Sequence, residues 1–275
     1  MAVSPSSGPV ESHYASRSLV DTVLAAVDEA GLPAGPLKTS DLAPLDQFHV
    51  RGLAATKELA ALAGIDAKSR VLDVGSGIGG PSRHLAESFG CQVVGIDLTA
   101  EYCRVAEALT ARTGLADRVT FEAANALDLP FKDGSVDVVW TQHVAMNIAD
   151  RPRLYSEMYR VLKPGGRLAL YDAIAIDGKE PLYPVPWARD PSTSFLLNAE
   201  ATRVVLEESG FAIRTWRDVS EEATQWFAAQ KPPAQPPKLG IHLLLGPDFR
   251  VMAGNFARNV TEGRVGLLMA VAEKS

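Results

Sequence analysis

The chain has 275 residues and a formal net charge of −6, and 47% of its residues are apolar and 22% charged, as in a globular protein. An acidic chain without a basic stripe is a poor partner for polyanions, so tRNA, rRNA and DNA are not expected to be partners. The N-terminus lacks a signal-peptide pattern, and no apolar run approaches the roughly 20 residues of a membrane span, so we expect a cytoplasmic protein with no membrane span.

The first part of the chain is expected to form an N-terminal helical cap or lid over residues 1–50. Residues 16–30 carry apolar positions at helical spacing and stop at Gly31-Leu-Pro, a pattern that predicts a helix. A second helix is expected over about 50–64, where Gly64 ends it. Residues 51–275 then form the expected core domain, in which strands and helices alternate.

The predicted strands of this core are apolar almost throughout, which is typical of a parallel sheet covered on both faces by crossover helices. They span residues 70–76, 91–98, 119–124, 136–142, 167–175, 211–220 and 263–274. Helices are predicted at 81–90, 100–114, 151–163 and 198–209, and insertions at about 175–200 and 220–260 are expected to form a substrate cap. The Pro-rich stretch 231–238 is expected to be a stiff surface loop, with a polyproline ligand as the alternative.

The cysteines are expected to be buried, reduced thiols. Cys91 and Cys103 fall in a predicted strand and in the helix after it. No arrangement of Cys and His in the sequence has the spacing of a zinc site, so no metal is expected.

A glycine-rich loop follows the first predicted strand. Gly75, Gly77 and Gly80 have the spacing of a dinucleotide-binding loop, which by itself suits any nucleotide. Asp73 precedes the first glycine by two residues, where its carboxylate would repel a pyrophosphate and attract a cationic ligand. Asp97 ends the second strand and can accept from both ribose hydroxyls, which fits S-adenosylmethionine (SAM) and NAD equally well. Asp73 therefore favours SAM over NAD.

Several motifs together resemble the class I SAM-dependent methyltransferases: the run from Asp73 to Gly79 (DVGSGIG), Asp97, and the turn Pro164-Gly165-Gly166 before the fifth strand. The resemblance covers about residues 50–175. It implies an α/β Rossmann-like, doubly wound, seven-stranded mixed sheet whose last strand is antiparallel, and S-adenosyl-L-methionine as cofactor. The expected cofactor-binding residues are Asp73, Gly75, Ser76, Gly77, Asp97, Leu98, Asn125, Ala126 and Gln142.

Two residues at the carboxyl ends of predicted strands are candidates for catalysis, since ligands of open α/β sheets bind at that edge. His143 follows the fourth strand and can act as a base or hydrogen-bond the substrate, or else it only contacts backbone or cofactor. Asp172 ends the fifth strand and resembles in position an acidic residue that assists deprotonation in some relatives, or else it caps the following turn. Those relatives often have a histidine where this chain has Met146 and Asn147, so a copied His/Asp pair is not indicated.

The substrate is expected to be a small molecule contacted by Gln47, His49, Tyr183, Trp187 and Arg189. The alternatives are that residues 46–49 only cap a helix and that the residues of the 180s only form a hydrophobic plug of the cap. The stretch GSGIGGPSRHLA and the last 29 residues before Ser275 are similar to sarcosine/dimethylglycine N-methyltransferases, which slightly favours N-methylation of a small polar amine. The alternatives are O- or C-methylation of a natural-product-like metabolite, or a SAM-binding cyclase or regulator. An NAD-dependent oxidoreductase is disfavoured by Asp73, and the sequence does not indicate an oligomeric state.

Overall fold

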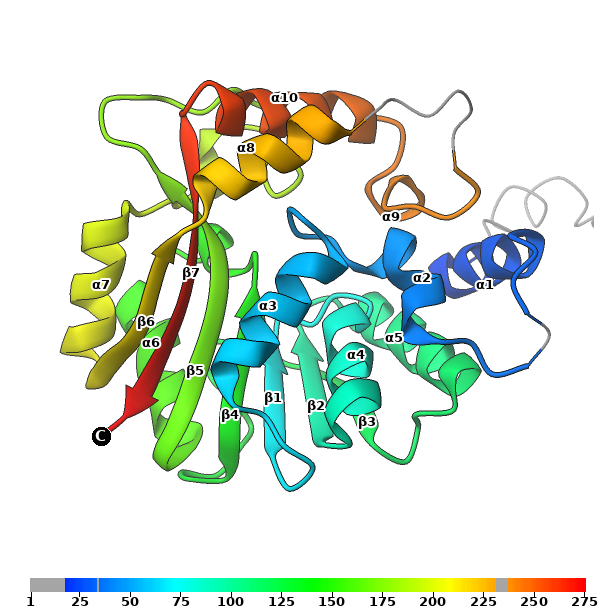
Figure 1. Cartoon of the computed structure of the whole chain (residues 1–275), viewed down its shortest axis with the longest axis horizontal. Coiled ribbons are helices and arrows are strands. Elements are labelled where there is room, and N and C mark those ends of the chain that lie inside the picture. The colour runs from blue at the N-terminus through cyan, green and yellow to red at the C-terminus, as the bar shows by residue number, and fades with distance from the viewer. Residues whose placement is uncertain (1–17, 34, 231–236) are drawn as a thin grey trace, which may run out of the picture.

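The computed structural model describes residues 18–33, 35–230 and 237–275, and its centre is a seven-stranded sheet (Figure 1). The strands are β1 (Arg70–Val74), β2 (Gln92–Asp97), β3 (Val119–Ala123), β4 (Val136–Gln142), β5 (Leu162–Ala175), β6 (Phe211–Asp218) and β7 (Val265–Lys274). Their order is β3-β2-β1-β4-β5-β7-β6, and β7 runs antiparallel to both of its neighbours while the other pairs are parallel. The predicted seven-stranded mixed sheet with an antiparallel last strand is confirmed.

Helices cover both faces of the sheet (Figure 1). One face carries α3 (Leu53–Ala63), α4 (Gly80–Phe89) and α5 (Ala100–Thr113), and the other carries α6 (Arg151–Val161) and α7 (Ala199–Glu208). Alternate strand residues enter the two cores, so that Trp140 packs with the first group and Val139 with the second. Because both faces are buried, the inner strands β1, β4 and β7 are apolar almost throughout, as predicted, whereas the edge strands β3 and β6 carry exposed polar residues.

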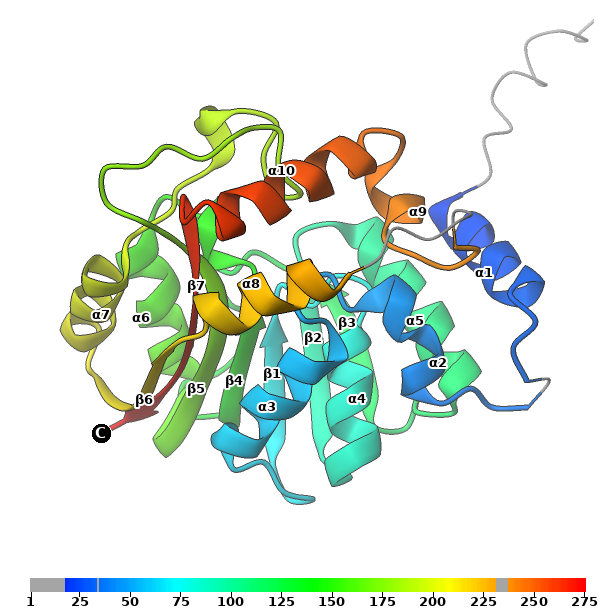
Figure 2. The same cartoon turned by 45° about the horizontal axis from the view of Figure 1, so that its top comes forward.

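A cap lies over the carboxyl ends of the strands (Figure 2). It consists of α1 (Leu19–Glu29), α2 (Thr39–Asp46), α8 (Ser220–Ala229), α9 (His242–Leu245) and α10 (Phe249–Thr261). Apolar side chains of α1 and α2 pack against α5 and against Leu239, in a core of their own. The predicted helices at 16–30 and 50–64 agree with α1 and α3. Residues 1–17 of the predicted cap and most of the predicted loop 231–238 lie outside the described residues.

The helices α2, α8 and α10 were not predicted individually. Pro44 lies inside the short α2, and a proline at such a position usually indicates a turn and not a helix. In α10, Met252, Phe256 and Val260 are buried at i, i+4 and i+8, so the helical stripe was present in the sequence but was assigned only to an irregular cap.

The register of β4 and β5 positions the end of both strands for function. Gln142 is the register partner of Tyr171, and the backbone N–H of His143 donates to the carbonyl of Tyr171 at 2.8 Å. His143 and Asp172 therefore come together at one edge of the sheet. Both cysteines are buried and free, as predicted. In the described part of the chain, no helix has the length and apolarity needed to cross a membrane.

Candidate functional site

A cavity of about 700 Å³ lies between the carboxyl edge of the sheet and the cap. Its walls come from the loops after β1, β2, β3 and β4 and from α2, α9 and α10. The charged groups among the described lining residues are the carboxylates of Asp46, Asp73, Asp97 and Asp150, and no Lys or Arg side chain lines it. This cavity lies where open α/β sheets bind their ligands.

The glycine loop after β1 forms one wall, and its conformation requires glycine. Gly75, Gly77 and Gly79 have φ of 75°, 54° and 81°, a region that residues with a Cβ rarely adopt. A Cβ on Gly75 would also lie 2.3 Å from Cγ2 of Val144, the residue after His143. The amides of Gly75 and Ser76 both donate to the carbonyl of Ile96, at 2.8 and 2.9 Å, which ties the loop to β2.

Asp97, at the end of β2, presents a fixed carboxylate to the cavity. Its Oδ2 accepts from the amide of Gly77 at 3.0 Å, and its Oδ1 accepts from the amide of Thr99 at 2.8 Å. Each oxygen keeps a lone pair for a further donor, such as a ribose hydroxyl. The next residue, Leu98, also lines the cavity, and 79% of its surface is exposed, which offers an apolar surface to a flat ring.

Asp73 is a buried carboxylate on the cavity wall. The hydroxyl of Ser82 donates to its Oδ2 at 2.5 Å. Burial raises the pKa of Asp73 to about 7, the Ser82 hydrogen bond lowers it, and the nearby Asp97 raises it. A cation placed beside Asp73 would favour the ionised form, which is what a sulfonium and an ammonium group supply.

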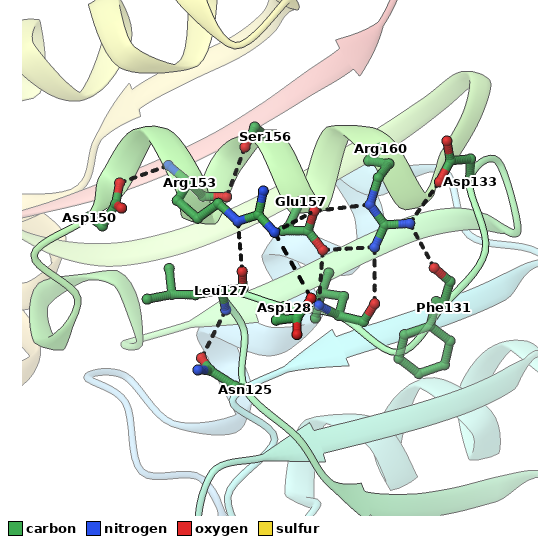
Figure 3. Close-up of polar contacts among 11 residues, drawn as sticks. Asn125, Leu127, Asp128, Phe131, Asp133, Asp150, Arg153, Ser156, Glu157 and Arg160 are labelled. Carbon is green, nitrogen blue, oxygen red and sulfur yellow. Dashed lines mark hydrogen bonds and ion pairs between the residues drawn. The ribbon is translucent and has the colours of Figure 1, made fainter.

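The loops after β1, β2 and β3 together form what we call the polar side of the cavity, and the loop after β3 contributes Asn125, Ala126 and Leu127. Figure 3 shows the hydrogen bonds of this loop. The side-chain carbonyl of Asn125 accepts from the amide of Leu127 at 2.9 Å, so one of its lone pairs is already used. Arginines of α6 hold the loop from below. Arg153 donates to the carbonyl of Leu127 at 2.8 Å, and Arg160 donates to the carbonyls of Leu129 and Phe131 at 2.9 and 2.7 Å.

Glu157 completes the network beneath the loop (Figure 3). Its side chain is 4% exposed, and its Oε2 accepts from Arg160 at 2.7 Å and from the amide of Leu129 at 2.9 Å. Hydrogen bonds from Arg160 lower the pKa of Glu157. Sequence reasoning did not identify these residues, because contacts between a loop and a later helix leave no local motif.

His143 lies at the centre of the cavity wall, directly after β4. Its φ of 55° is in the left-handed region, where a non-glycine residue is strained, and such strain is concentrated at functional sites. Burial, and then the neighbouring His49, lower its pKa well below the usual value. Its Nε2 is buried and has no hydrogen-bond partner among the described residues. The imidazole is therefore neutral at physiological pH and can accept a proton.

Asp172 lies behind the turn that contains His143. Its Oδ1 accepts from the amide of Val144 at 2.9 Å, and the side chain is not part of the cavity wall. Burial raises its pKa to about 6, against the lowering effect of Arg151 and of backbone hydrogen bonds. This geometry matches the alternative, a carboxylate that caps the turn after β4.

Aromatic rings form the second side of the cavity, the aromatic side, made of His49, His143, Trp187 and Phe256. The ring centroid of His143 lies 6.0 Å from the ring centroid of His49 and 6.0 Å from that of Phe256. The ring centroids of Trp187 and Phe256 are 4.9 Å apart. Further apolar residues of the same cavity are Phe48, Met146, Pro186, Ile241, Leu245 and Phe249. This composition suits an apolar ligand.

Asn147 holds the aromatic side in place and was not predicted. Its Nδ2 donates to the carbonyls of Trp187 and Thr193, at 2.7 and 3.0 Å, and the indole N–H of Trp187 donates to Ser194 at 3.0 Å. The segment of Trp187 is thereby joined to the turn after β4. The unusual Asn147 where relatives often have histidine was the available signal.

The predicted substrate residues divide into two groups. His49 and Trp187 line the cavity, whereas Gln47, Tyr183 and Arg189 do not. Gln47 is buried and accepts from Thr56 at 2.7 Å, and Arg189 is exposed in an ion pair with Asp248. Of the predicted polar substrate contacts, His49 alone therefore lines the cavity, and Gln47 and Arg189 do not. The predicted cofactor residues, from Asp73 through Gln142, all line the cavity.

Comparison with protein families adds a decisive observation. Residues 72–170 match the model of a methyltransferase domain, and this range contains the glycine loop, Asp97 and His143. The matched segment is a methyltransferase domain, as in the class I SAM-dependent methyltransferases.

Individual relatives of this chain differ in their reactions. The 27-O-demethylrifamycin SV methyltransferase of Amycolatopsis mediterranei is 28% identical, over 80% of this chain and 82% of that protein. A glycine/sarcosine/dimethylglycine N-methyltransferase of Actinopolyspora halophila is 34% identical, over 49% of this chain and 24% of that protein. Others are 37 to 42% identical, but the matched segments span 28 to 48% of their lengths. Among solved structures, the [4+2]-cyclase SpnF is similar with a TM-score of 0.66 and 25% identity, over 100% of this chain and 98% of that one.

S-adenosylmethionine is the cofactor of the matched domain, and the polar side of the cavity fits it. Asp97 has lone pairs left for the ribose hydroxyls, and Leu98 and the loop of Asn125 flank an apolar slot. Ser76 lines the cavity, and its hydroxyl is buried without a partner among the described residues. Asp73 supplies negative charge near a cationic group. Within the described ranges, no cluster of His, Cys, Asp and Glu could hold a metal ion.

Proposed function

We propose that this methyltransferase transfers a methyl group from SAM to a hydroxyl group of an uncharged, largely apolar small molecule. The observation that carries the proposal is His143, a strained and buried imidazole that lines the cavity where the polar and aromatic sides meet, and whose Nε2 has no partner among the described residues. A hydroxyl nucleophile needs a base, whereas a free amine needs only to be unprotonated. A neutral histidine at this position supplies that base.

The charge of the cavity disfavours an anionic acceptor. Among the described residues, carboxylates line the cavity and no Lys or Arg side chain does, so a phosphorylated or carboxylated acceptor would be repelled and would lack a counter-ion. A small polar amine, which the sequence favoured slightly, loses support because Gln47, Tyr183 and Arg189 do not line the cavity. The aromatic side instead offers apolar surface to a larger acceptor.

In this reaction the residues of the aromatic side would bind the acceptor, and His143 would accept its proton. SAM, when bound, supplies an activated methyl group and a neutral leaving group. Trp187 and Phe256 hold the apolar body of the acceptor and exclude water, and this aligns its hydroxyl with the methyl carbon. Nε2 of His143 accepts the hydroxyl proton as the new O–C bond forms. Asp172 fixes the turn through the amide of Val144, and Asn147 fixes Trp187 against the same turn.

A labelling experiment tests the proposal. SAM with a labelled methyl group is incubated with the protein and a panel of hydroxylated apolar compounds, their phosphorylated counterparts, and small amines including methylated glycines. We expect methyl incorporation into uncharged hydroxyl compounds only. Labelling of the small amines alone would reject the proposal.

A substitution at His143 tests its role. Asparagine tolerates the left-handed backbone but is not a base, so His143→Asn should lower turnover about 10²- to 10⁴-fold while the affinity for S-adenosylhomocysteine stays unchanged. Normal turnover in this variant would remove His143 from the mechanism.

A second candidate function is a reaction in which SAM stays bound and unreacted. The observation that favours it is the similarity to the [4+2]-cyclase SpnF, which extends over the whole chain including the cap. In the labelling experiment this candidate predicts a new product without methyl incorporation and without formation of S-adenosylhomocysteine.

A further inference from the structure

A second imidazole faces the cavity beside His143. His49 lies in the connection between α2 and α3, which passes over the carboxyl ends of the strands (Figure 1). It lines the cavity, and its ring centroid is 6.0 Å from that of His143. The ring stands edge-on to Tyr171, with centroids 5.9 Å apart and an interplanar angle of 85°. The proposed reaction uses the imidazole of His143 as a base, but it gives the ring nitrogens of His49 no use.

A strained turn after His49 holds its imidazole. Arg51 and Gly52 have φ of 65° and 49°, and a left-handed conformation is uncommon for arginine. The amide of Gly52 donates to the carbonyl of His49 at 3.1 Å, and the carbonyl of Gly52 lies 2.9 Å from Nε2 of the same histidine. Arg51 pairs with Glu58 of α3 at 2.6 Å. Because strain of this kind is concentrated at functional sites, the turn indicates that the orientation of His49 matters.

The hydrogen bond to Gly52 also fixes the position of the proton on His49. Burial lowers the pKa of His49 to about 4, so the ring is neutral at physiological pH and carries one N–H. A carbonyl oxygen only accepts, so this N–H is on Nε2, which donates to Gly52. The hydroxyl of Thr56, 3.0 Å from Nε2, donates its own proton to Gln47 at 2.7 Å and therefore also accepts from Nε2. Nδ1 is left with a lone pair and no proton.

The lone pair of His49 is accessible from the cavity. No described residue hydrogen-bonds Nδ1, and Nδ1 is not one of the solvent-inaccessible polar atoms of the described chain that lack a partner. Nδ1 therefore keeps accessible surface, and the open space beside the ring is the cavity that His49 lines. The cavity thus contains an oriented hydrogen-bond acceptor next to the proposed base.

We propose that Nδ1 of His49 accepts a hydrogen bond from a second hydroxyl group of the acceptor, on the carbon atom next to the one that carries the methylated hydroxyl. A hydrogen bond spans about 2.8 Å, so two hydroxyls on adjacent carbons can reach two imidazoles whose centroids are 6.0 Å apart. The first hydroxyl gives its proton to His143, and the second stays protonated and orients the acceptor. This inference deepens the proposed function and rests on it.

His49 would then determine the class of acceptor. A compound with one hydroxyl displaces water from the cavity and leaves Nδ1 without a donor, and an unpaired buried acceptor is costly. A vicinal diol or a catechol supplies both donors. The site therefore favours these two classes over compounds with a single hydroxyl.

Paired compounds test this selection by binding, without any need for methyl transfer. The pairs are tert-butylcatechol with tert-butylphenol and cis-indanediol with indanol, and each is titrated by calorimetry into protein saturated with S-adenosylhomocysteine. In at least one pair, wild type should bind the two-hydroxyl member about 5- to 100-fold more tightly. Equal affinities within both pairs, tight or weak, would overturn the proposal.

The same compounds separate this inference from the proposed function. Methyl incorporation into the one-hydroxyl members, without preference in binding, would support the proposed function and overturn the role of His49. Preferred binding of a two-hydroxyl member without methyl incorporation would support the role of His49 and count against the proposed function.

A matched pair of variants tests the residue itself. In His49→Gln the side-chain amide can donate to Gly52 in place of Nε2, but no acceptor replaces Nδ1, so the preference should fall below about threefold. His84→Gln changes a buried histidine of α4 outside the cavity wall and should keep the wild-type preference. An undiminished preference in His49→Gln would overturn the proposal.

A measurement on wild type keeps the test valid if His49→Gln folds poorly. The ¹⁵N resonances of His49 should show a proton on Nε2 and none on Nδ1. The two-hydroxyl member of the preferred pair should shift the Nδ1 resonance, and its one-hydroxyl counterpart should not. A proton on Nδ1 in the free protein, or equal shifts with both members, would overturn the proposal.

Discussion

The polar and aromatic sides of the cavity are built in different ways. The polar side comes from segments that directly follow β1, β2 and β3, and hydrogen bonds such as Gly77 to Asp97 hold it. The aromatic side joins His49 of the N-terminal cap, His143 after β4, Trp187 of the segment after β5, and Phe256 of α10. The first side is fixed by backbone conformation and the second by packing between distant segments.

This difference predicts where each side tolerates change. A hydrogen-bonded loop in a left-handed conformation has few alternatives, so a single added atom disrupts it. Packed apolar side chains can be exchanged for others of similar volume at modest cost. Relatives that methylate different acceptors can therefore share the polar side and differ on the aromatic side.

The largest expected effect is that of Gly75→Ala on cofactor affinity. Alanine at this position would have to adopt a φ near 75°, and its Cβ would lie 2.3 Å from Cγ2 of Val144. Backbone strain and overpacking together cost about 2–5 kcal/mol, so the affinity for S-adenosylhomocysteine should fall at least about 30-fold. Gly178→Ala is the matched control, because Gly178 has φ of 73° but no atom within 4 Å of its Cβ position. Calorimetry on both variants checks the result, and an unchanged affinity in Gly75→Ala would contradict the rigid-loop interpretation.

The next effect concerns Trp187 and the acceptor. Trp187→Ala removes the ring that packs on Phe256, and loss of a central aromatic anchor costs about 1–3 kcal/mol. With an accepted substrate, KM for the acceptor should rise about 10- to 100-fold while the affinity for S-adenosylhomocysteine stays unchanged. Trp187→Phe keeps the ring contact and loses only the indole donor to Ser194, so it should be milder. Equal loss of affinity for cofactor and acceptor would mean that the two sides are not independent.

The sequence predicted the polar side because its geometry is encoded locally. Gly75, Gly77 and Asp97 occur at fixed spacings around two strands, and all the predicted cofactor residues line the cavity. The seven-stranded mixed sheet and its antiparallel last strand were likewise implied by the family resemblance.

The aromatic side was predicted only in part, for a physical reason. Its members are brought together by helices α8 and α10 and by the segment that Asn147 holds, and no local pattern encodes those long-range contacts. Tyr183 and Arg189 were chosen for their chemistry and their sequence neighbourhood, yet Arg189 points to Asp248 at the surface. Asp172 was correctly located at the sheet edge, but only the structure shows that its partner is the amide of Val144.

A pH experiment sharpens the electrostatic part of the comparison, and its effect should be about tenfold. Burial raises the pKa of Asp73 to about 7, above the usual 3.8, so the free protein holds a proton there below neutral pH. A cationic ligand favours the ionised carboxylate and lowers this pKa, which releases the proton on binding. The affinity for S-adenosylhomocysteine should therefore rise up to about tenfold from pH 6 to pH 8.

Proton release distinguishes Asp73 from the other groups that titrate in this range. Burial also raises the pKa values of Asp46 and Asp172 to about 6. Calorimetry in buffers of different ionisation enthalpy should detect proton release near neutral pH in wild type, and less of it in Asp73→Asn. If the release is unchanged in Asp73→Asn, the pH dependence belongs to another carboxylate.

The smallest effect is expected for the network under the loop after β3. Arg160→Lys keeps the positive charge beside Glu157 but cannot reproduce the planar set of donors that reaches the carbonyls of Leu129 and Phe131 (Figure 3). Loss of these bonds should cost about 0.5–1.5 kcal/mol, and the affinity for adenosyl ligands should fall about 2- to 10-fold. The loop of Asn125 and Leu98 flank an apolar slot, where we expect the adenine ring to bind. 5′-Methylthioadenosine, which lacks the amino-acid part, should therefore lose as much affinity as S-adenosylhomocysteine. Arg214→Lys, at an exposed ion pair with Glu273 far from the loop, is the control and should change neither affinity. A loss confined to S-adenosylhomocysteine would indicate that the loop after β3 contacts the amino-acid end of the ligand instead.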